Sequence, residues 1–251
     1  MEIREIYNTI FKRKSIRKFD RNLSISHDEI RKINGQITRL APLIEYIKTQ
    51  FEIVDRRQTT SKRGEYCLLM YSEEKPGYLQ NAGYMLEQMD LFLTSQNIGV
   101  CWYGVGKPKT HNKNGLKYVI MLAFGKCLAE NFRYNTSEFK RKDPRLISKG
   151  NFMPDIASVV RLAPSGCNLQ PWRFSCAKNE IIVYRNVNMK KFPAKKKALY
   201  DETDFRFIDM GIVIKYLEIA LKYKQFKYIK IIRLNYNPEK EEIEVAKYCL
   251  K

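Results

Sequence analysis

The sequence predicts an α+β protein made of two tandem repeats, residues 1–135 and 136–251. Two strings of four residues occur twice in the chain. FKRK begins at residue 11 and again at residue 139, and RLAP begins at residue 39 and again at residue 161. Because strings that recur in the same order are typical of a duplicated unit, we expect the halves to pack together as one compact unit. This intrachain pseudo-dimer would be built around antiparallel sheet and long core helices.

Helix and hairpin signals come in the same order in both halves. One helix pattern runs from Ser26 to Pro42 and another from Met153 to Pro164. Each is expected to end at the proline of RLAP, because proline cannot continue a helix. A pair of strand patterns separated by a polar turn follows each helix, which predicts a hairpin. The paired strands cover 51–54 with 65–71 and 172–177 with 180–184.

A long helix is predicted after each hairpin, over residues 81–99 and 208–225. In the first helix Met85, Met89 and Leu93 fall on one apolar stripe at helical spacing, and the second helix has an equivalent stripe. Strand-like runs close the two halves at residues 118–125 and 227–234. The repeated order of helix, hairpin, helix and strand supports the duplication.

The charge of the chain leaves two classes of function open. Lysine and arginine number 46 against 27 for aspartate and glutamate, so the formal net charge is +19. Such a field attracts polyanions and anionic metabolites. A basic nucleic-acid-binding or regulatory protein with little redox activity is therefore the alternative to an enzyme. Tyr223, Phe226 and Tyr228 alternate with lysines and would stack bases in such a protein, although the same pattern suits the covering face of a terminal helix and strand.

Cysteine and histidine usage argues against a metal centre. The chain has six cysteines without a CxxC pair and only two histidines, which leaves little material for a metal site or a His-dependent triad. The N-terminus lacks the apolar segment of a signal peptide, and no apolar run reaches the ~18 residues of a membrane span. We expect a cytoplasmic protein with reduced thiols, no metal and no membrane partner.

The stretch RKSIRKF, residues 13–19, concentrates groups that bind a phosphate. Arg13, Lys14, Ser15 and Arg17 provide two guanidinium groups, an ammonium group and a hydroxyl within five residues. Arginine binds phosphate through paired hydrogen bonds of fixed geometry, and serine adds a short neutral donor. The cluster therefore suits one terminal phosphate group, with a solvated basic face as the alternative.

Two loops are further candidates. RLAPSGCNLQPWRF, residues 161–174, places a tight turn and the amides of Asn168 and Gln170 between a predicted helix and strand. Such a loop presents polar groups to the edge of a flat heterocycle, or simply connects two elements. NIGVCWYGVG, residues 97–106, has three glycines after a helix, which predicts an exposed backbone that approaches a ligand, or a plain helix end.

Together, RKSIRKF, APSGCNLQPW and GYLQNAGYMLEQMDLFLTSQNIGVCWYG resemble the flavin-dependent nitroreductase-like family, and in particular its internally duplicated branch. The resemblance spans about residues 5–235. It implies a nitroreductase-like fold and an FMN-dependent oxidoreductase. Hydride would pass from NADH or NADPH through the flavin to a small-molecule, electron-poor acceptor such as a nitroaromatic or quinone, with no catalytic side chain. The same fold also hosts flavin-fragmenting and dehalogenating enzymes, so a flavin enzyme with a different reaction stays open.

The resemblance also implies the residues that bind the cofactor. Four residues match those that bind the FMN phosphate, ribityl chain and pyrimidine edge in the family: Arg13, Lys14, Ser15 and Arg17. Tyr103 and Gly104 match a turn beside the reactive nitrogen of the flavin. The segment that the other subunit supplies in ordinary dimers of the family is matched by Pro164, Ser165, Gly166 and Asn168. Arg141 matches a late element that closes on the phosphate, although Asp143 departs from the usual context.

The departures from this pattern bear on the number of sites. The first RLAP is followed by LIEY and lacks the Ser-Gly-Cys-Asn loop, and the second FKRK is followed by DPRLI and lacks Ser-x-Arg. Each half therefore keeps one complementary part. We expect one complete flavin site per chain, in a monomeric pseudo-dimer or a homodimer.

Overall fold

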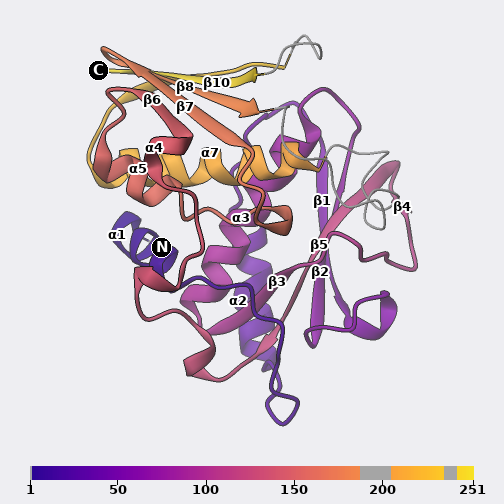
Figure 1. Ribbon diagram of the computed structural model, residues 1–251. Helices are drawn as coiled ribbons and strands as arrows, with labels where there is room; N and C mark the ends of the chain where they lie inside the picture. Colours follow the sequence, from indigo (N-terminus) through magenta and orange to yellow (C-terminus); the bar gives the residue numbers. More distant parts are fainter. Residues whose placement is uncertain (1, 187–204, 235–241) are drawn as a thin grey trace. The chain divides into compact units, whose positions relative to one another are not determined.

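The computed structural model describes residues 2–186, 205–234 and 242–251. The chain divides into two compact units, Met1–Glu138 and Phe139–Lys251. Each unit combines helices with one five-stranded sheet (Figure 1). The predicted α+β class is therefore confirmed. In the part of the chain that the structure describes, no helix is long and apolar enough to cross a membrane.

Unit 1 is built on an antiparallel sheet. The strand order is β1-β2-β5-β3, and a short strand, β4, pairs with β5. The predicted hairpin is β1 and β2, paired from Thr49 opposite Ser72 to Asp55 opposite Tyr66. The strands are β1 (Thr49–Asp55), β2 (Tyr66–Ser72), β3 (Ile98–Trp102), β4 (Asn112–Lys113) and β5 (Leu116–Lys126).

Three helices complete unit 1, and the longest, α3, is buried along most of its length. α3 packs on β2, β3 and β5 and also contacts α1 and α2. Ser26 and Glu29 form a capping box that starts α2, since each side chain receives a hydrogen bond from the other residue's backbone N–H. The helices are α1 (Ile3–Lys12), α2 (His27–Ile37) and α3 (Tyr78–Ser95), with 3₁₀ turns η1 (Arg56–Gln58), η2 (Ala129–Asn131) and η3 (Thr136–Glu138).

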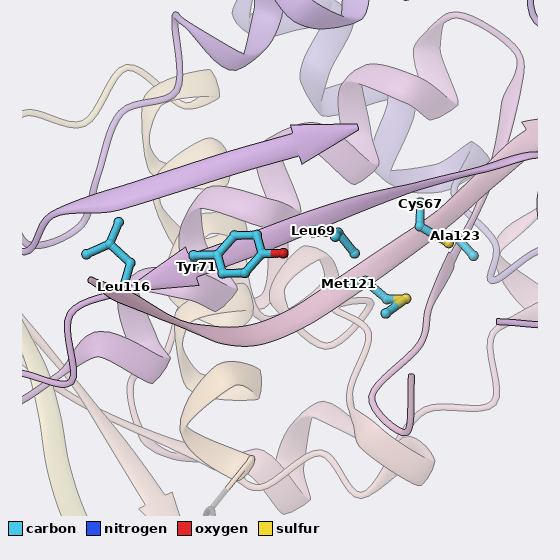
Figure 2. Close-up of a cluster of buried hydrophobic side chains, with 6 residues drawn as sticks. All are labelled: Cys67, Leu69, Tyr71, Leu116, Met121 and Ala123. Carbon is cyan, nitrogen blue, oxygen red and sulfur yellow. The ribbon is translucent and has the colours of Figure 1, made fainter. Parts of the chain in front are cut away.

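A cluster of buried side chains covers one face of the unit 1 sheet (Figure 2). Its members alternate along β2, as side chains on one face of a strand do, and along β5 on either side of a bulge: Cys67, Leu69, Tyr71, Leu116, Met121 and Ala123. The loop after β3 lies on this cluster. Tyr118 donates a hydrogen bond to the Gly106 carbonyl over 2.9 Å, and burial raises the pKa of the Tyr118 hydroxyl. The cluster thus anchors the loop that carries Tyr103 and Gly104.

Unit 2 contains a sheet of order β6-β7-β8-β10-β9, antiparallel except for the β6–β7 pair. The long helix α7 packs against α5 and β8. The strands are β6 (Ser148–Gly150), β7 (Trp172–Ala177), β8 (Glu180–Asn186), β9 (Tyr228–Ile232) and β10 (Glu242–Leu250). The helical segments are α4 (Pro144–Ile147), α5 (Pro154–Val160), the 3₁₀ turn η4 (Gly166–Asn168) and α7 (Arg206–Tyr223).

Both predicted hairpins and both long helices are present, but three local predictions were wrong. α2 ends at Ile37 and α5 at Val160, before either RLAP string is reached. The glycine-containing stretch after α3 begins as strand β3, because Ile98–Trp102 finds a partner in β5. Finally, β10 was missed, although it is the strand between β8 and β9.

The internal duplication itself remains a prediction. Two features of the units agree with it. The order β1-β2-β5-β3 has the same chain connectivity as β7-β8-β10-β9. In addition, α3 begins at Tyr78 and α7 at Arg206, and these two starts are separated by the same offset as the two FKRK strings.

Candidate functional site

Arg13, the C-terminal cap of α1, is a buried residue with a carboxylate partner. Its side chain is 1% exposed. Nε and Nη2 donate hydrogen bonds to Oδ2 of Asp90 over 3.0 and 2.7 Å. The same oxygen of Asp90 accepts a third hydrogen bond, from Nε1 of Trp102 over 2.8 Å. A buried charge is stable only when it is paired in this way, so Asp90 determines where Arg13 lies.

The segment after Arg13 is held against strand β3. The Ile16 N–H donates to the Val100 carbonyl over 2.8 Å, and Ser15 forms an isolated parallel bridge with Val100. The Ser15 hydroxyl accepts a hydrogen bond from Nη2 of Arg13 over 3.3 Å. Arg13 therefore fixes both the position of Ser15 and the end of α1. Its predicted role as a phosphate ligand stays a prediction, since its guanidinium is directed to Asp90.

Lys14 and Arg17 are more accessible than Arg13. The Lys14 ammonium lies 3.5 Å from a carboxylate oxygen of Glu138, and its side chain is 39% exposed. Arg17 is exposed and has no hydrogen-bond or carboxylate partner among the residues that the structure describes. Among the three cations predicted to bind phosphate in RKSIRKF, Arg17 thus has the charge that is most available to an anion.

The Tyr103–Gly104 turn presents backbone rather than side chain. The Tyr103 N–H donates to the Met121 carbonyl, and the ring packs on the buried cluster of Figure 2 with the Arg63 guanidinium 5.6 Å from its centroid. Gly104 follows, and its N–H has no hydrogen-bond partner within the described residues. A Cβ at this position would meet only the Ile120 side chain, at 3.9 Å. The turn therefore offers an accessible amide donor.

In unit 2, Arg141 and Asn168 lie together although they are 27 residues apart in the chain. Nη1 of Arg141 donates to Oδ1 of Asn168 over 2.7 Å. Nε and Nη2 donate to the carbonyls of Ala163 and Leu162 over 3.1 and 3.2 Å. Asn168 in turn donates to the Lys140 carbonyl over 2.7 Å. Arg141 therefore braces the RLAP segment and the loop that follows it.

Helix α7 holds the backbone of the predicted Pro164–Asn168 loop. The Gly166 N–H donates to Oδ1 of Asp209, a buried residue of α7, over 2.9 Å. The Ser165 hydroxyl accepts from the Gln170 N–H over 2.9 Å. Three residues of this loop that are not glycine have positive φ: Cys167, Asn168 and Gln170, at 50°, 57° and 51°. Such backbone costs free energy and is kept where surrounding contacts enforce it, often at ligand-binding loops.

An equivalent support holds the RLAP segment of unit 1. Oδ1 of Asn81, in α3, accepts hydrogen bonds from the N–H groups of Leu43 and Ile44 over 2.8 and 3.1 Å. Asn81 and Asp209 are separated by the same offset as the two FKRK strings. Both units thus use a side chain on the long helix to hold the backbone that follows RLAP.

Sequence reasoning missed Asp90, Asn81 and Asp209, which position the candidate residues. A signal was present, because Asp90 lies between Met89 and Leu91 in a mostly apolar segment of the helix, and a buried carboxylate needs a partner. No group of three or more His, Cys, Asp or Glu side chains in the described ranges is placed to hold a metal ion.

The chain matches a family model described as "Putative TM nitroreductase" over residues 5–221. No curated protein matches significantly. A solved structure from Thermotoga maritima, described as a putative nitroreductase, is similar over 98% of this chain and 92% of that chain. The TM-score is 0.62 at 18% sequence identity, a level that shows the shared fold alone.

Two further structures cover a smaller part of this chain. One, from Bacteroides thetaiotaomicron, is described as a putative NADH dehydrogenase/NAD(P)H nitroreductase. It is 14% identical, with 59% of this chain and 98% of that chain covered and a TM-score of 0.45. The other, from Clostridium acetobutylicum, is described as a putative NADH oxidase. It is 15% identical, with 57% and 99% covered and a TM-score of 0.43.

Proposed function

Because the chain belongs to the family described as "Putative TM nitroreductase", and is in this general sense an oxidoreductase, we propose that it is FMN-dependent. In this proposal it takes hydride from NADH or NADPH and passes it through FMN to an electron-poor acceptor such as a nitroaromatic or a quinone. The observation that carries the proposal is the extent of the family match. Residues 5–221 include both RKSIRKF and the Pro164–Asn168 loop.

The candidate residues of unit 1 fit an FMN molecule chemically. Arg17 has an exposed guanidinium without a partner in the described chain, and Ser15 has a hydroxyl two residues before it in the sequence. A phosphate or pyrimidine oxygen accepts hydrogen bonds from such donors. The unpartnered N–H of Gly104 suits an acceptor on the edge of a flat ring, because no side chain intervenes there.

In this mechanism the chain supplies binding and electrostatics. FMN, when bound, supplies the hydride transfer. Arg17 provides a positive charge that stabilises negative charge on the pyrimidine edge. Arg13 is held by Asp90 and donates a hydrogen bond to Ser15, and its contact with the FMN phosphate is part of the proposal. In unit 2, Arg141 and Asp209 hold the loop containing Ser165, Gly166 and Asn168 in one conformation. The contribution of this loop to cofactor binding is part of the proposal.

The test begins with the colour of the purified full-length chain. We expect protein that carries FMN or takes it up, releases it on denaturation and binds one FMN per chain in a titration. Under anaerobic conditions NADH or NADPH should bleach the bound flavin, and a nitroaromatic or a quinone should restore its absorption.

Protein that neither contains FMN nor binds added FMN would overturn the proposal. A stoichiometry of two per chain would contradict the single site. Flavin that binds but is not bleached by NADH or NADPH would keep the cofactor and exclude these donors.

A further inference from the structure

Unit 1 contains a hollow of about 830 Å³ that is strongly basic. It lies between the segment after Ser15, the loop joining β1 to β2, and the end of β5. Eight cationic residues line it, against three acidic ones, Asp20, Asp55 and Glu65. The cations are Arg17, Lys18, Arg21, Arg56, Arg57, Lys62, Arg63 and Lys126. The lining therefore carries a net charge of +5.

Most of this positive charge is not neutralised by the chain. Two of the cations pair with carboxylates: Arg57 with Asp55 over 2.8 Å, and Lys126 with Glu29 over 2.5 Å. Arg63 directs its guanidinium to Tyr103 and to the sulfur of Cys101. Five have no hydrogen bond or ion pair for the side chain among the described residues: Arg17, Lys18, Arg21, Arg56 and Lys62. Of these, Arg56 adds to the effect of Arg57 in lowering the pKa of Asp55.

The three carboxylates of the hollow are already engaged. Asp55 accepts hydrogen bonds from the side chain and backbone N–H of Arg57, and these hold its pKa at about 2. Glu65 accepts the Ile25 N–H over 2.8 Å, and Asp20 accepts the Asn22 N–H over 2.9 Å. None of these three carboxylates forms a hydrogen bond or ion pair with one of the five unpaired cations.

The wall of the hollow is rigid because its loop is fixed to the sheet. The Glu65 N–H donates to the Phe124 carbonyl over 2.8 Å. Gly64 has φ of +74°, and a Cβ there would lie 2.7 Å from the Phe124 oxygen, so glycine allows the loop to lie directly on β5. The hydroxyl of Ser61 accepts from the Arg63 N–H and donates to the Arg63 carbonyl. Such a preformed cavity binds ligands without a large ordering cost.

We propose that this hollow binds a compact anion containing two or more linked phosphates, such as the diphosphate of a nucleotide or an inorganic polyphosphate. Several unpaired cations around one cavity match an anion of multiple charge better than a single phosphate. The volume suits a small molecule. Phe19 is the only aromatic residue of the described lining, so the stacking surface expected for single-stranded nucleic acid is absent from it. The proposal does not depend on flavin chemistry.

Arg17 belongs both to the lining of the hollow and to the residues proposed to bind FMN. The test therefore uses variants of residues outside the proposed flavin site. The double variant Arg56→Ala/Lys62→Ala removes two unpaired cations from the hollow. A matched control, Lys32→Ala/Arg39→Ala, removes two exposed cations of the same unit that do not line the hollow. Full-length protein saturated with FMN, and the same protein without added FMN, is titrated calorimetrically with sodium pyrophosphate, tripolyphosphate and ADP.

We expect both inorganic anions to bind, and the affinity to fall about tenfold or more in the hollow variant, as for loss of charge-assisted hydrogen bonds. The control should stay within about twofold, because neither of its cations lines the hollow. Tighter binding of ADP than of pyrophosphate would identify the nucleotide as the source, and equal binding the inorganic anion.

Three results would overturn the proposal. The first is no binding of pyrophosphate or tripolyphosphate. The second is an equal loss of affinity in the two double variants, which would reflect net charge alone. The third is competition between FMN and pyrophosphate, which would make the hollow part of the flavin site. A protein that binds no FMN still permits the first two comparisons, so this test and that of the flavin are separable.

Discussion

The arginine of FKRK occurs in both units and has a different partner in each. In unit 1, Arg13 binds the buried carboxylate of Asp90 in α3. In unit 2, Arg141 binds two backbone carbonyls and the side chain of Asn168. At the offset of the two FKRK strings, the position of α7 that corresponds to Asp90 is Glu218, which accepts hydrogen bonds from Lys230 and Tyr248 instead. The same four residues thus stabilise a helix end in one unit and a loop in the other.

The three residues after FKRK differ in a way that changes the available charge. Arg145 follows Asp143 as Arg17 follows Ser15, so both units keep an arginine at this position. Asp143 accepts hydrogen bonds from Nε and Nη2 of Arg145 over 3.0 and 2.9 Å, whereas Arg17 has no partner within the described residues. The aspartate at the position of Ser15 therefore gives Arg145 a carboxylate partner that Arg17 lacks.

The largest effect is expected from Asp90→Asn, which removes the feature specific to unit 1. The change leaves the Arg13 charge buried without a counter-charge, so the free energy of unfolding should fall by about 3–5 kcal/mol. Chemical denaturation of the full chain measures this. Asp155→Asn is the control, because it breaks an ion pair with Lys224 in which the aspartate is 72% exposed, for which we expect less than about 1 kcal/mol. Equal effects of the two variants would show that the buried pair is not important.

Arg141→Ala tests the loop support of unit 2. Loss of hydrogen bonds to Leu162, Ala163 and Asn168 should reduce the free energy of unfolding by about 1–3 kcal/mol. It should also speed amide hydrogen exchange at Asn168 and Leu169, whose N–H groups bond within the loop. Arg145→Ala serves as control, and exchange at these amides should not change. Unchanged exchange in Arg141→Ala would mean that other contacts, such as those of Asp209 and Lys142, are enough to hold the loop.

A comparison of Arg17→Ala with Arg145→Ala tests whether the unpaired arginine of unit 1 binds an anion that the paired arginine of unit 2 does not. If Arg17 contacts FMN, its loss should weaken FMN binding about tenfold, the effect of one charge-assisted hydrogen bond. Arg145 is already paired with Asp143, so its loss should change the affinity less than about twofold. Fluorescence titration of FMN with each variant measures this. Similar affinities of the two variants would remove Arg17 from the proposed site.

The smallest effect is expected on the pKa of one carboxyl group, that of Asp143. Hydrogen bonds from Arg145 hold the pKa of Asp143 at about 2. Its folded pKa is depressed, so any stabilisation by the pair is present above the unfolded pKa of ~3.9 and is lost as the pH falls through about 2. In Arg145→Ala the pKa should rise toward the unfolded value, followed by NMR of the Asp143 carboxyl carbon. Asp55, whose pKa is held at about 2 by Arg57 in unit 1, is the internal control and should not move.

Much of the fold could be predicted from the sequence, because its signals are local. The hairpins β1–β2 and β7–β8 and the helices α3 and α7 follow from apolar spacing and turn residues within each segment. β3 was not predicted, because it has only five residues, contains Gly99, and becomes a strand by pairing with β5. β10 was also not predicted: its buried residues alternate as Ile243 and Val245, and the alternation shifts by one residue at a bulge to Ala246 and Tyr248.

The candidate site was predictable only in part for the same reason. The chemical type of RKSIRKF and of the Pro164–Asn168 loop can be seen in the residues themselves, and so can the family resemblance. Which arginine is buried cannot, since Asp90 is 77 residues from Arg13 and Asn168 is 27 residues from Arg141. The hollow of unit 1 likewise combines residues 17–24 with residues 55–65 and 125–126, which no local pattern connects.

By itself, the sequence determined the class of this protein: its α+β elements, its repeated strings, its excess of positive charge and its membership of a nitroreductase family. These follow from residue types and from spacing within short segments. The tertiary structure alone decided how the charges are used. Burial makes an unpaired charge costly, so the buried Arg13 is paired with Asp90, while the partly exposed Arg141 donates to carbonyls and to Asn168. Arg17, at the surface, has no such constraint and keeps its charge for a ligand.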